Sequence, residues 1–285
     1  MSSRTRQNHV ITFTQANIVA GTNNSILRYY FPQGGASFPA DQPARVGVAK
    51  IVMYNSIFNI TAALGNNTFS YTWYSAGAPV TTDVTIPDGS YSVSDLNGFL
   101  QFTMFNNGHY LVDGSANIVY YLELELNSSQ YAVQFNSYPI PTALPAGYTN
   151  PAGITFPAVA TTPQITVAAN LTTYLGFTAG SYPPVVQATN YSHLSDTAPQ
   201  VDSVSTLLIH TNIVNNRLSV PSSIIYTFVF NSVFGDVTVV QPPYILFSTV
   251  QAGQYASIDI RITDASNNPV DINDPNMTIL LALEY

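Results

Sequence analysis

The residues that could carry out chemistry are few in this sequence, and they lie far apart. There is no cysteine, which excludes disulfides, cysteine–metal sites and a thiol nucleophile. The histidines are His9, His109, His193 and His210, and no two of them have metal-ligand spacing. The chain also lacks the glycine-serine elbow of hydrolases, the phosphate-binding loop and the zinc-peptidase motif. We therefore predict no catalytic, cofactor-binding or metal-binding residue.

Two polar clusters come closest to a site. His193-Leu-Ser-Asp196 places a base near a hydroxyl and an acid, although a turn with local hydrogen bonds is the favoured interpretation. Asp271-Ile-Asn-Asp-Pro-Asn276 gathers oxygen ligands of the kind that Ca²⁺ prefers. It lacks the spacing of a twelve-residue calcium loop, so a turn is again favoured and a cation site is the alternative.

Low charge is the feature that most limits the function. Only 8% of the residues are charged, against about 25% in ordinary soluble domains. No Asp, Glu, Lys or Arg occurs between Glu125 and Asp196. Because charge keeps proteins soluble and separate, a chain this poor in charge and 12% aromatic is expected to be covered by copies of itself or by partners. A secreted β-sandwich solubilised by Asn, Ser and Thr is an equally weighted alternative.

The few charges are unevenly placed. Residues 1–50 hold five Lys and Arg against one Asp, a balance of +4, and the rest of the chain has a balance of −12. A short basic arm with Arg4 and Arg6 is expected to contact an anionic partner or an acidic neighbouring subunit, and a solvated terminus is the alternative. The acidic body is not expected to bind nucleic acid over a broad face. No apolar run reaches the length of a membrane span, and the polar N-terminus predicts no signal peptide.

The chain is predicted to be built from strands, because apolar residues alternate with polar ones between Gly, Pro and Asn turns. Leu122, Leu124 and Leu126 should face away from the intervening glutamates, and the isoleucines of 258–262 should face away from Asp259 and Arg261. Further strands are expected at 10–18, 25–31, 45–55, 69–73, 82–86, 130–135, 204–213, 224–230, 237–247 and 277–284.

One helix interrupts the strands. Ser92 lies three residues before Asp95, which predicts a capping box, and Gly108 is a plausible stop. Its apolar stripe is Leu96, Phe99, Leu100 and Thr103, widened by Phe102, Met104 and Phe105. That width predicts packing on more than one side. Residues 137–184 are rich in Pro, Ala, Gly and Thr but also in aromatics, which predicts an ordered, loop-rich region with a short helical turn at 171–177.

Without residues 66–200, the chain keeps eight candidate strands, the number in a jelly roll of two antiparallel sheets. We predict an all-β fold: a single eight-stranded antiparallel jelly roll with an inserted, mostly β domain that carries one short helix. Residues 1–65 plus 201–285 form the discontinuous jelly-roll domain in this prediction, and residues 66–200 form the insertion domain.

Several stretches together resemble a known family. They are Ser25-Ile-Leu-Arg-Tyr-Tyr-Phe31, residues 48–60, Asn66-Asn-Thr-Phe-Ser-Tyr-Thr-Trp73, residues 86–100, Leu175-Gly-Phe177 and residues 199–205. In this order and spacing they resemble the penton, or minor capsid, proteins of virophages and Polinton-like double-stranded DNA viruses. The similarity covers roughly residues 20–285.

The resemblance implies a structural viral protein without enzymatic activity. Five copies would form a homopentameric penton at each fivefold vertex of an icosahedral capsid, beside trimers of a double-jelly-roll major capsid protein. The basic N-terminal arm would meet the capsid interior or the genome. The protein would be located in the virion after assembly in the host cytoplasm. The family has no small binding motif that maps onto individual residues here, so no site residues follow from the resemblance.

Two other functions remain open at this point. A glycan-binding β-sandwich, such as a viral fibre head or a lectin, would stack sugars on exposed aromatics and would be a trimer or a monomer. Candidates are Trp73, within an alternating aromatic strand, and the adjacent Tyr120 and Tyr121, which should point to opposite faces. An enzyme that uses the carboxylates near residues 264–274 is the weaker alternative, and it would need a pocket with paired acids.

Overall fold

The computed structural model describes residues 7–201, 204 and 206–285, and the chain divides into two compact units. The first unit, here called the roll, contains Met1–Ile57 and Val204–Tyr285. The second, here called the insertion unit, is Phe58–Ser203. The chain leaves the roll eight residues earlier than the expected boundary at residue 65, and it returns three residues later than the expected boundary at residue 200.

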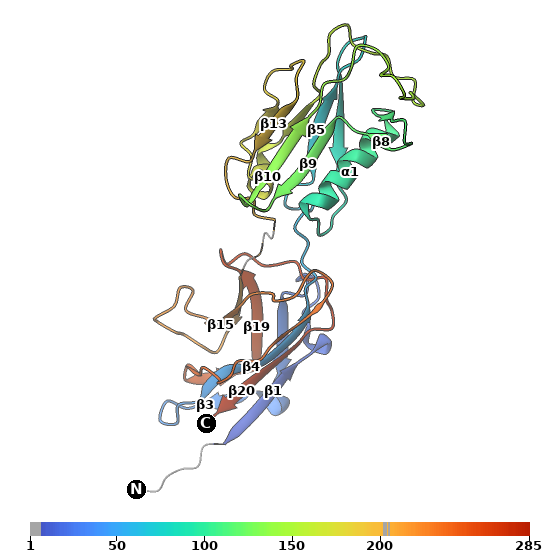
Figure 1. Cartoon of the computed structure of the whole chain (residues 1–285). Coiled ribbons are helices and arrows are strands. Elements are labelled where there is room, and N and C mark those ends of the chain that lie inside the picture. Colours follow the sequence, from blue (N-terminus) through green and yellow to red (C-terminus); the bar gives the residue numbers. More distant parts are fainter. Residues whose placement is uncertain (1–6, 202–203, 205) are drawn as a thin grey trace. The chain divides into compact units, whose positions relative to one another are not determined.

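The roll consists of two antiparallel sheets (Figure 1). The first sheet has the order β1-β20-β4-β16, and the second has the order β15-β14-β19-β2. Their strands are β1 (Asn8–Phe13), β2 (Ile26–Tyr30), β4 (Arg45–Tyr54), β14 (Leu207–Thr211), β15 (Ile224–Phe228), β16 (Val237–Val240), β19 (Ser257–Asp264) and β20 (Thr278–Glu284). The short β17 (Ser248–Thr249) pairs with β4, and β3 (Ala36–Phe38) pairs with β18 (Gly253–Tyr255).

The pairing of these eight strands is that of a jelly roll. Taken in chain order, the first strand pairs with the eighth, the second with the seventh, the third with the sixth and the fourth with the fifth. A long antiparallel ribbon that is folded over into two sheets has this pattern of nested pairs. The prediction of an all-β chain built on one eight-stranded jelly roll is confirmed.

Apolar side chains at alternating positions of the strands form the core of the roll. On β4 the inward side chains are Val46, Val48, Ile51 and Met53, each 0–1% exposed. The step from 48 to 51 breaks the period of two, and there the register against β20 shifts between Leu280 and Leu281. Ala49 is the extra residue of this β-bulge, and apolar side chains point inward on both sides of it.

Several of the predicted strands are shorter than expected, among them the one expected at 204–213, which is Leu207–Thr211. The strand expected at 10–18 ends at Phe13, because Thr14 and Asn17 form a capping box around a 3₁₀ turn at Gln15–Asn17. The strand expected at 237–247 ends at Val240. Pro242 and Pro243 follow, and neither has a backbone N–H to donate to a sheet.

The insertion unit is also mostly β. Its sheets have the orders β12-β11-β5-β6, β13-β10-β9 and β7-β8. The strands are β5 (Thr68–Trp73), β6 (Val80–Thr85), β7 (Leu111–Val112), β8 (Ile118–Val119), β9 (Leu122–Asn127), β10 (Ala132–Ser137), β11 (Gln164–Val167), β12 (Gly180–Tyr182) and β13 (Tyr191–Leu194). The region 137–184 is ordered as predicted, and the expected helical turn is α2 (Thr172–Leu175).

The predicted helix is α1 (Val93–Asn106), and it begins with the expected capping box of Ser92 and Asp95. It lies along the edge of β9 (Figure 1), where the Asn97 side chain accepts a hydrogen bond from the backbone N–H of Leu124 at 2.9 Å. The expectation of packing on more than one side is wrong. The buried residues Val93, Leu96, Leu100 and Met104 form one stripe, whereas Phe102 and Phe105 are 60% and 42% exposed.

Candidate functional site

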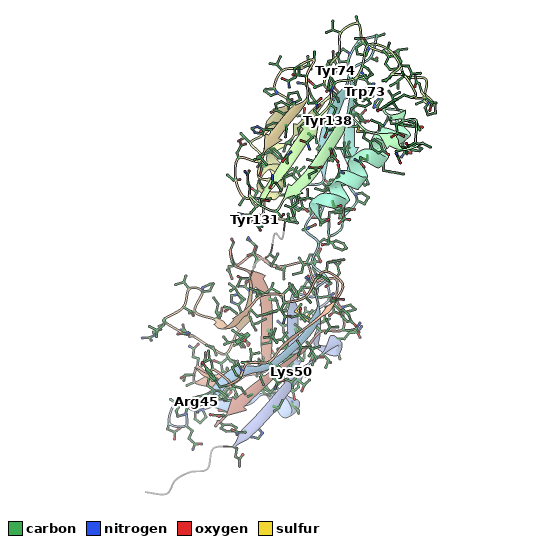
Figure 2. The ribbon with its side chains drawn as sticks, in the orientation of Figure 1. Arg45, Lys50, Trp73, Tyr74, Tyr131 and Tyr138 are labelled. Carbon is green, nitrogen blue, oxygen red and sulfur yellow. The ribbon has the colours of Figure 1, made fainter. Side chains whose placement is uncertain are left out.

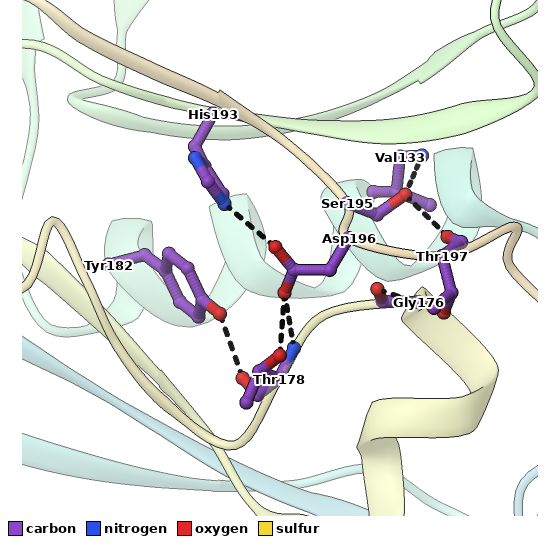
Figure 3. Close-up of polar contacts among 8 residues, drawn as sticks. All are labelled: Val133, Gly176, Thr178, Tyr182, His193, Ser195, Asp196 and Thr197. Atoms are coloured by element: carbon purple, nitrogen blue, oxygen red, sulfur yellow. Dashed lines mark hydrogen bonds and ion pairs between the residues drawn. The ribbon is translucent and has the colours of Figure 1, made fainter.

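The His193 cluster is held together by stacked rings and hydrogen bonds (Figure 3). Nε2 of His193 lies 3.5 Å from a carboxylate oxygen of Asp196, and both side chains are about 40% exposed. The imidazole stacks on Tyr182 and Tyr191, with ring centroids 5.2 and 6.1 Å apart. The other oxygen of Asp196 accepts hydrogen bonds from the backbone N–H and the hydroxyl of Thr178, both at 2.8 Å. These bonds lower the pKa of Asp196, and His193 adds a smaller effect.

The hydroxyl of Ser195 takes no part in this pair. Its oxygen accepts a hydrogen bond from the backbone N–H of Val133 at 3.1 Å and donates to the carbonyl of Thr197 at 3.0 Å (Figure 3). A nucleophilic serine needs its hydroxyl directed at the base. Here the hydroxyl joins the turn to β10, so the three polar residues stabilise a loop.

The acidic segment 271–276 ties the end of β4 to the start of β20. Asp274 is 4% exposed, and its carboxylate accepts hydrogen bonds from the backbone N–H groups of Tyr54, at 2.8 Å, and Asn276, at 2.7 Å. The Asn273 side chain donates to the carbonyl of Ser56 at 2.7 Å. The oxygens that Ca²⁺ would need are therefore used by backbone donors. Among the described residues, no group of three or more His, Asp or Glu side chains is arranged to hold a metal ion.

The aromatic side chains that a sugar would need are inside the insertion unit. Trp73 is 2% exposed and stacks on His109 with ring centroids 4.7 Å apart (Figure 2). Tyr121 is 6% exposed and Tyr120 is half-buried against the same core; neither lies in a strand, so the prediction that they point to opposite faces of one strand is wrong. Tyr131 is 65% exposed. The only tryptophan of the chain therefore offers no stacking platform.

Two histidines have strongly lowered pKa values. Burial lowers the pKa of His109 to about 4. Burial also lowers the pKa of His210 to about 4, and the nearby positive charge of Arg261 contributes. His210 is 2% exposed, and its ring nitrogens share hydrogen bonds with Ser223, at 3.0 Å, and Thr263, at 2.8 Å. Both imidazoles are neutral at pH 7 and serve as packing groups.

The outer face of the second sheet is mostly polar and its charged groups form hydrogen bonds within the chain, although Tyr30 on β2 is 67% exposed there. Arg28 donates two hydrogen bonds to the carboxylate of Asp259, at 2.8 and 2.6 Å, from the opposite position on β2. Arg261 donates to the side chain of Asn267 at 2.8 Å. These contacts and the hydrogen bonds of His210 give these polar groups partners within the chain.

The outer face of the first sheet carries a group of apolar side chains, beside outward polar residues such as Thr12, Thr278 and Lys50. The apolar ones, on β1, β4, β16 and β20, lie side by side in the register of the sheet. They are Val10, Val52, Tyr54, Val237, Val239, Leu280 and Ala282, and we call them the apolar face. Four of them are strongly exposed, since Val10 is 64% exposed, Val239 47%, Tyr54 44% and Val237 43%. The single lysine of the chain, Lys50, stands beside Leu280 in the same row (Figure 2).

The side chains of strand β16 do not follow the usual alternation, in which apolar residues face the core and polar residues face water. In its sequence Val-Thr-Val-Val, alternation would direct Val237 and Val239 to the core and Thr238 to water. The structure has the reverse orientation, because Thr238 is fully buried and both valines are outside. The buried hydroxyl of Thr238 is satisfied by Ser232 at 2.5 Å. A strand that turns its valines outward supports the view that this face is covered in the working protein.

Part of the first sheet is covered by the chain itself. A Cβ atom at Gly47 would lie 2.5 Å from a methyl group of Ile245 and 2.5 Å from the carbonyl oxygen of Leu246. The glycine thus lets the segment after β16 pass directly over the sheet. Arg45 is beneath the same segment, with its guanidinium 5.1 Å from the ring centroid of Phe247, and it pairs with Glu284.

The basic arm lies mainly outside the described residues, since these begin at Gln7 and exclude Arg4 and Arg6. His9, expected to belong to the arm, is part of β1, and its ring lies 5.8 Å from that of Tyr285. Within the described part of the chain, no helix is long and apolar enough to cross a membrane.

No protein-family model and no curated protein sequence matches this chain. Among solved structures, the chain is similar to the mavirus penton protein, with a TM-score of 0.44 and 11% identity. It is also similar to a chain in the electron cryo-microscopy structure of the Sputnik virophage, with a TM-score of 0.43 and 12% identity. Each similarity covers 98% of this chain and 97% of the other.

The sequence did not predict the apolar face as a site. Its signal is present in the Val-Thr-Val-Val segment, but period-two reasoning assigns those valines to the core. The low overall charge favoured a surface covered by copies or partners, and the exposed valines of the apolar face are the candidate for it.

Proposed function

We propose that this chain is a structural capsid protein, and that five copies form a penton at each fivefold vertex of an icosahedral shell. The observation that supports it best is the apolar face on a jelly roll in a chain of only 8% charged residues. Exposed groups of apolar side chains often mark protein–protein contacts. The resemblance of the sequence to penton proteins supplies the number five and the position at the vertex.

In this proposal the partners are copies of the chain and a major capsid protein of the double-jelly-roll type. The N-terminal arm, with its two arginines, would meet the capsid interior or the genome. Residues 66–200 would form an insertion domain, and the protein would be located in the virion after assembly in the host cytoplasm. No catalysis is assigned, because the polar clusters that could have supplied it bond to backbone groups.

Native mass spectrometry of the purified chain, over a range of concentrations and at two salt concentrations, tests this function. A species of five copies is the expected result, because a ring needs one patch of each subunit to meet a different patch of the next. A trimer would contradict the proposal and favour an attachment protein of the fibre type. If only monomers form, co-expression with the major capsid protein decides, since a chain that stays out of assembled shells is not a penton.

A further inference from the structure

The loop between β14 and β15 exposes two apolar side chains almost completely. Leu218 is 97% exposed and Val220 is 96% exposed, more than the other large apolar side chains of the described residues. The loop extends away from the second sheet (Figure 1). Burial of an aliphatic side chain stabilises a complex, so an exposed pair on a projecting loop favours contact with a partner.

The tip of this loop is ordered by its own hydrogen bonds. The side-chain oxygen of Asn216 accepts a bond from the backbone N–H of Leu218 at 3.0 Å, and its carbonyl accepts one from the N–H of Ser219 at 3.2 Å. The N–H of Asn216 donates to the carbonyl of Ser222 at 2.6 Å. Because the tip is already held in one conformation, little ordering entropy remains to be lost when it binds.

The roll also carries a surface that suits this loop. The apolar face on the first sheet presents Val237 and Val239 on the edge strand β16. The loop and the strand also carry opposite charges. Arg217 precedes Leu218 on the loop, and Asp236 precedes Val237 on the strand. Both charged side chains are exposed, and neither forms an ion pair with any residue that the structure describes.

The loop cannot cover the apolar face of its own chain. It joins two strands of the second sheet, and the base of the loop pairs with Val250 beside β17, whereas the apolar face is on the outer side of the first sheet. Sheets that are packed face to face lie about 10 Å apart, and their outer sides point in opposite directions. Contact between the loop and the face therefore requires a second copy of the chain. A contact between two different patches repeats from copy to copy and can close a ring.

We propose that Leu218 and Val220 of one copy bind the apolar face of the next copy, beside Val237 and Val239, and that Arg217 pairs with Asp236 across the contact. This inference rests on the proposed assembly into a ring, and it names the surfaces that join the ring. The occupant of the apolar face is thus a neighbouring copy of this chain.

Disulfide trapping tests the contact directly, because the natural chain has no cysteine. The variant L218C/V239C, mildly oxidised, is expected to give a ladder of cross-linked species that ends at five on a non-reducing gel. The single variants L218C and V239C should give none, and neither should L218C/V185C, since Val185 is a 72% exposed residue of the insertion unit. If L218C alone cross-links as strongly as L218C/V239C, the loops meet each other and the proposal is overturned.

Two further variants separate this inference from the proposed function. L218S/V220S should weaken assembly by about a hundredfold or more, because two aliphatic side chains no longer leave water. V185S, the matched control, should assemble normally. R217E and D236R should each weaken assembly, and R217E/D236R should restore it. If the natural chain forms pentamers and L218S/V220S forms them equally well, the inference is wrong and the penton proposal stands. If the natural chain forms no ring, alone or with the major capsid protein, both fail.

Discussion

The two sheets of the roll have similar inner faces and different outer faces. Both turn a row of fully buried aliphatic residues inward, such as Ile51 and Met53 on β4 and Ile258 and Ile260 on β19. The second sheet faces outward with an arginine–aspartate pair and a hydrogen-bonded histidine, whereas the first faces outward with valine, leucine and tyrosine. The inner rows explain why the roll folds, and the outer rows show that its two sheets present different side chains to the outside.

The difference between the two outer faces is tested most strongly by placing a lysine on each of them. V239K places a lysine in the apolar face, and T227K places one at an exposed, outward position of β15 on the second sheet. V239K should raise the concentration needed for assembly by at least about a hundredfold, because an unpaired charge buried in an interface costs several kcal/mol. T227K should assemble like the natural chain. Native mass spectrometry measures both.

If T227K also prevents assembly, the second sheet is an interface as well, and the comparison fails. Circular dichroism shows whether either variant has lost its fold. Both positions point away from the core, so the free energy of unfolding of the monomer should change by no more than about 0.5 kcal/mol.

The pH dependence of stability tests the environment of His210 in the second sheet. Its pKa is about 4 in the folded roll and about 6.5 in an unfolded chain, so between these values the unfolded chain binds more protons. The free energy of unfolding should therefore fall as the pH drops from about 6.5 to about 4, by up to about 3 kcal/mol from this residue, and stay constant above pH 7. Denaturant unfolding at a series of pH values measures the slope.

The matched variants are H210Q in the roll and H109Q in the insertion unit, where burial also lowers the pKa to about 4. Each should remove its own part of the pH dependence at the cost of some stability at neutral pH. A slope that survives in H210Q/H109Q would mean that the carboxylates, and not these histidines, cause the acid sensitivity.

Gly47 tests the part of the first sheet that the chain covers itself. In G47A the new methyl group would meet Ile245 and the carbonyl of Leu246 at 2.5 Å, so the covering segment has to move. Such overpacking costs about 1–3 kcal/mol, which urea unfolding would measure. G77A, where a Cβ atom has no neighbour within 4 Å, is the control and should be close to neutral. Equal stability of G47A and the natural chain would show that the segment does not pack on the sheet.

The smallest effect is expected for the ion pair on the second sheet. The side chains of Arg28 and Asp259 are 37% and 24% exposed, and partly exposed pairs contribute little to stability. The bonds to Asp259 raise the pKa of Arg28, which is charged at every working pH in any case. D259N should lower the melting temperature slightly at low salt and match the natural chain at about 1 M salt, where screening is nearly complete. A large, salt-independent loss would show that Asp259 has a packing role.

Features that depend on neighbours in the chain were predictable from the sequence. Ser92 and Asp95 start α1 because each side chain reaches a backbone group three residues away. The same five-residue loop closes one hairpin in each unit, at Asp113-Gly-Ser-Ala-Asn117 and at Asp264-Ala-Ser-Asn-Asn268. In both, the aspartate accepts bonds from the N–H groups two and four residues later, at 2.8–2.9 Å. The eight strands of the roll followed from alternation in the same way.

The sequence by itself thus determined the strands, the helix and the turns, since hydrogen bonds over a few residues and a period of two decide them. Its low charge indicated a surface covered by copies or partners, with a secreted β-sandwich as the equally weighted alternative. The tertiary structure alone decided which side chains of the roll face outward. Whether Val239 or Thr238 faces the core depends on the register of β16 against β4 and on Ser232, which satisfies the buried hydroxyl. Alternation gives a strand two faces, and only its partners in the sheet decide which face becomes the outside.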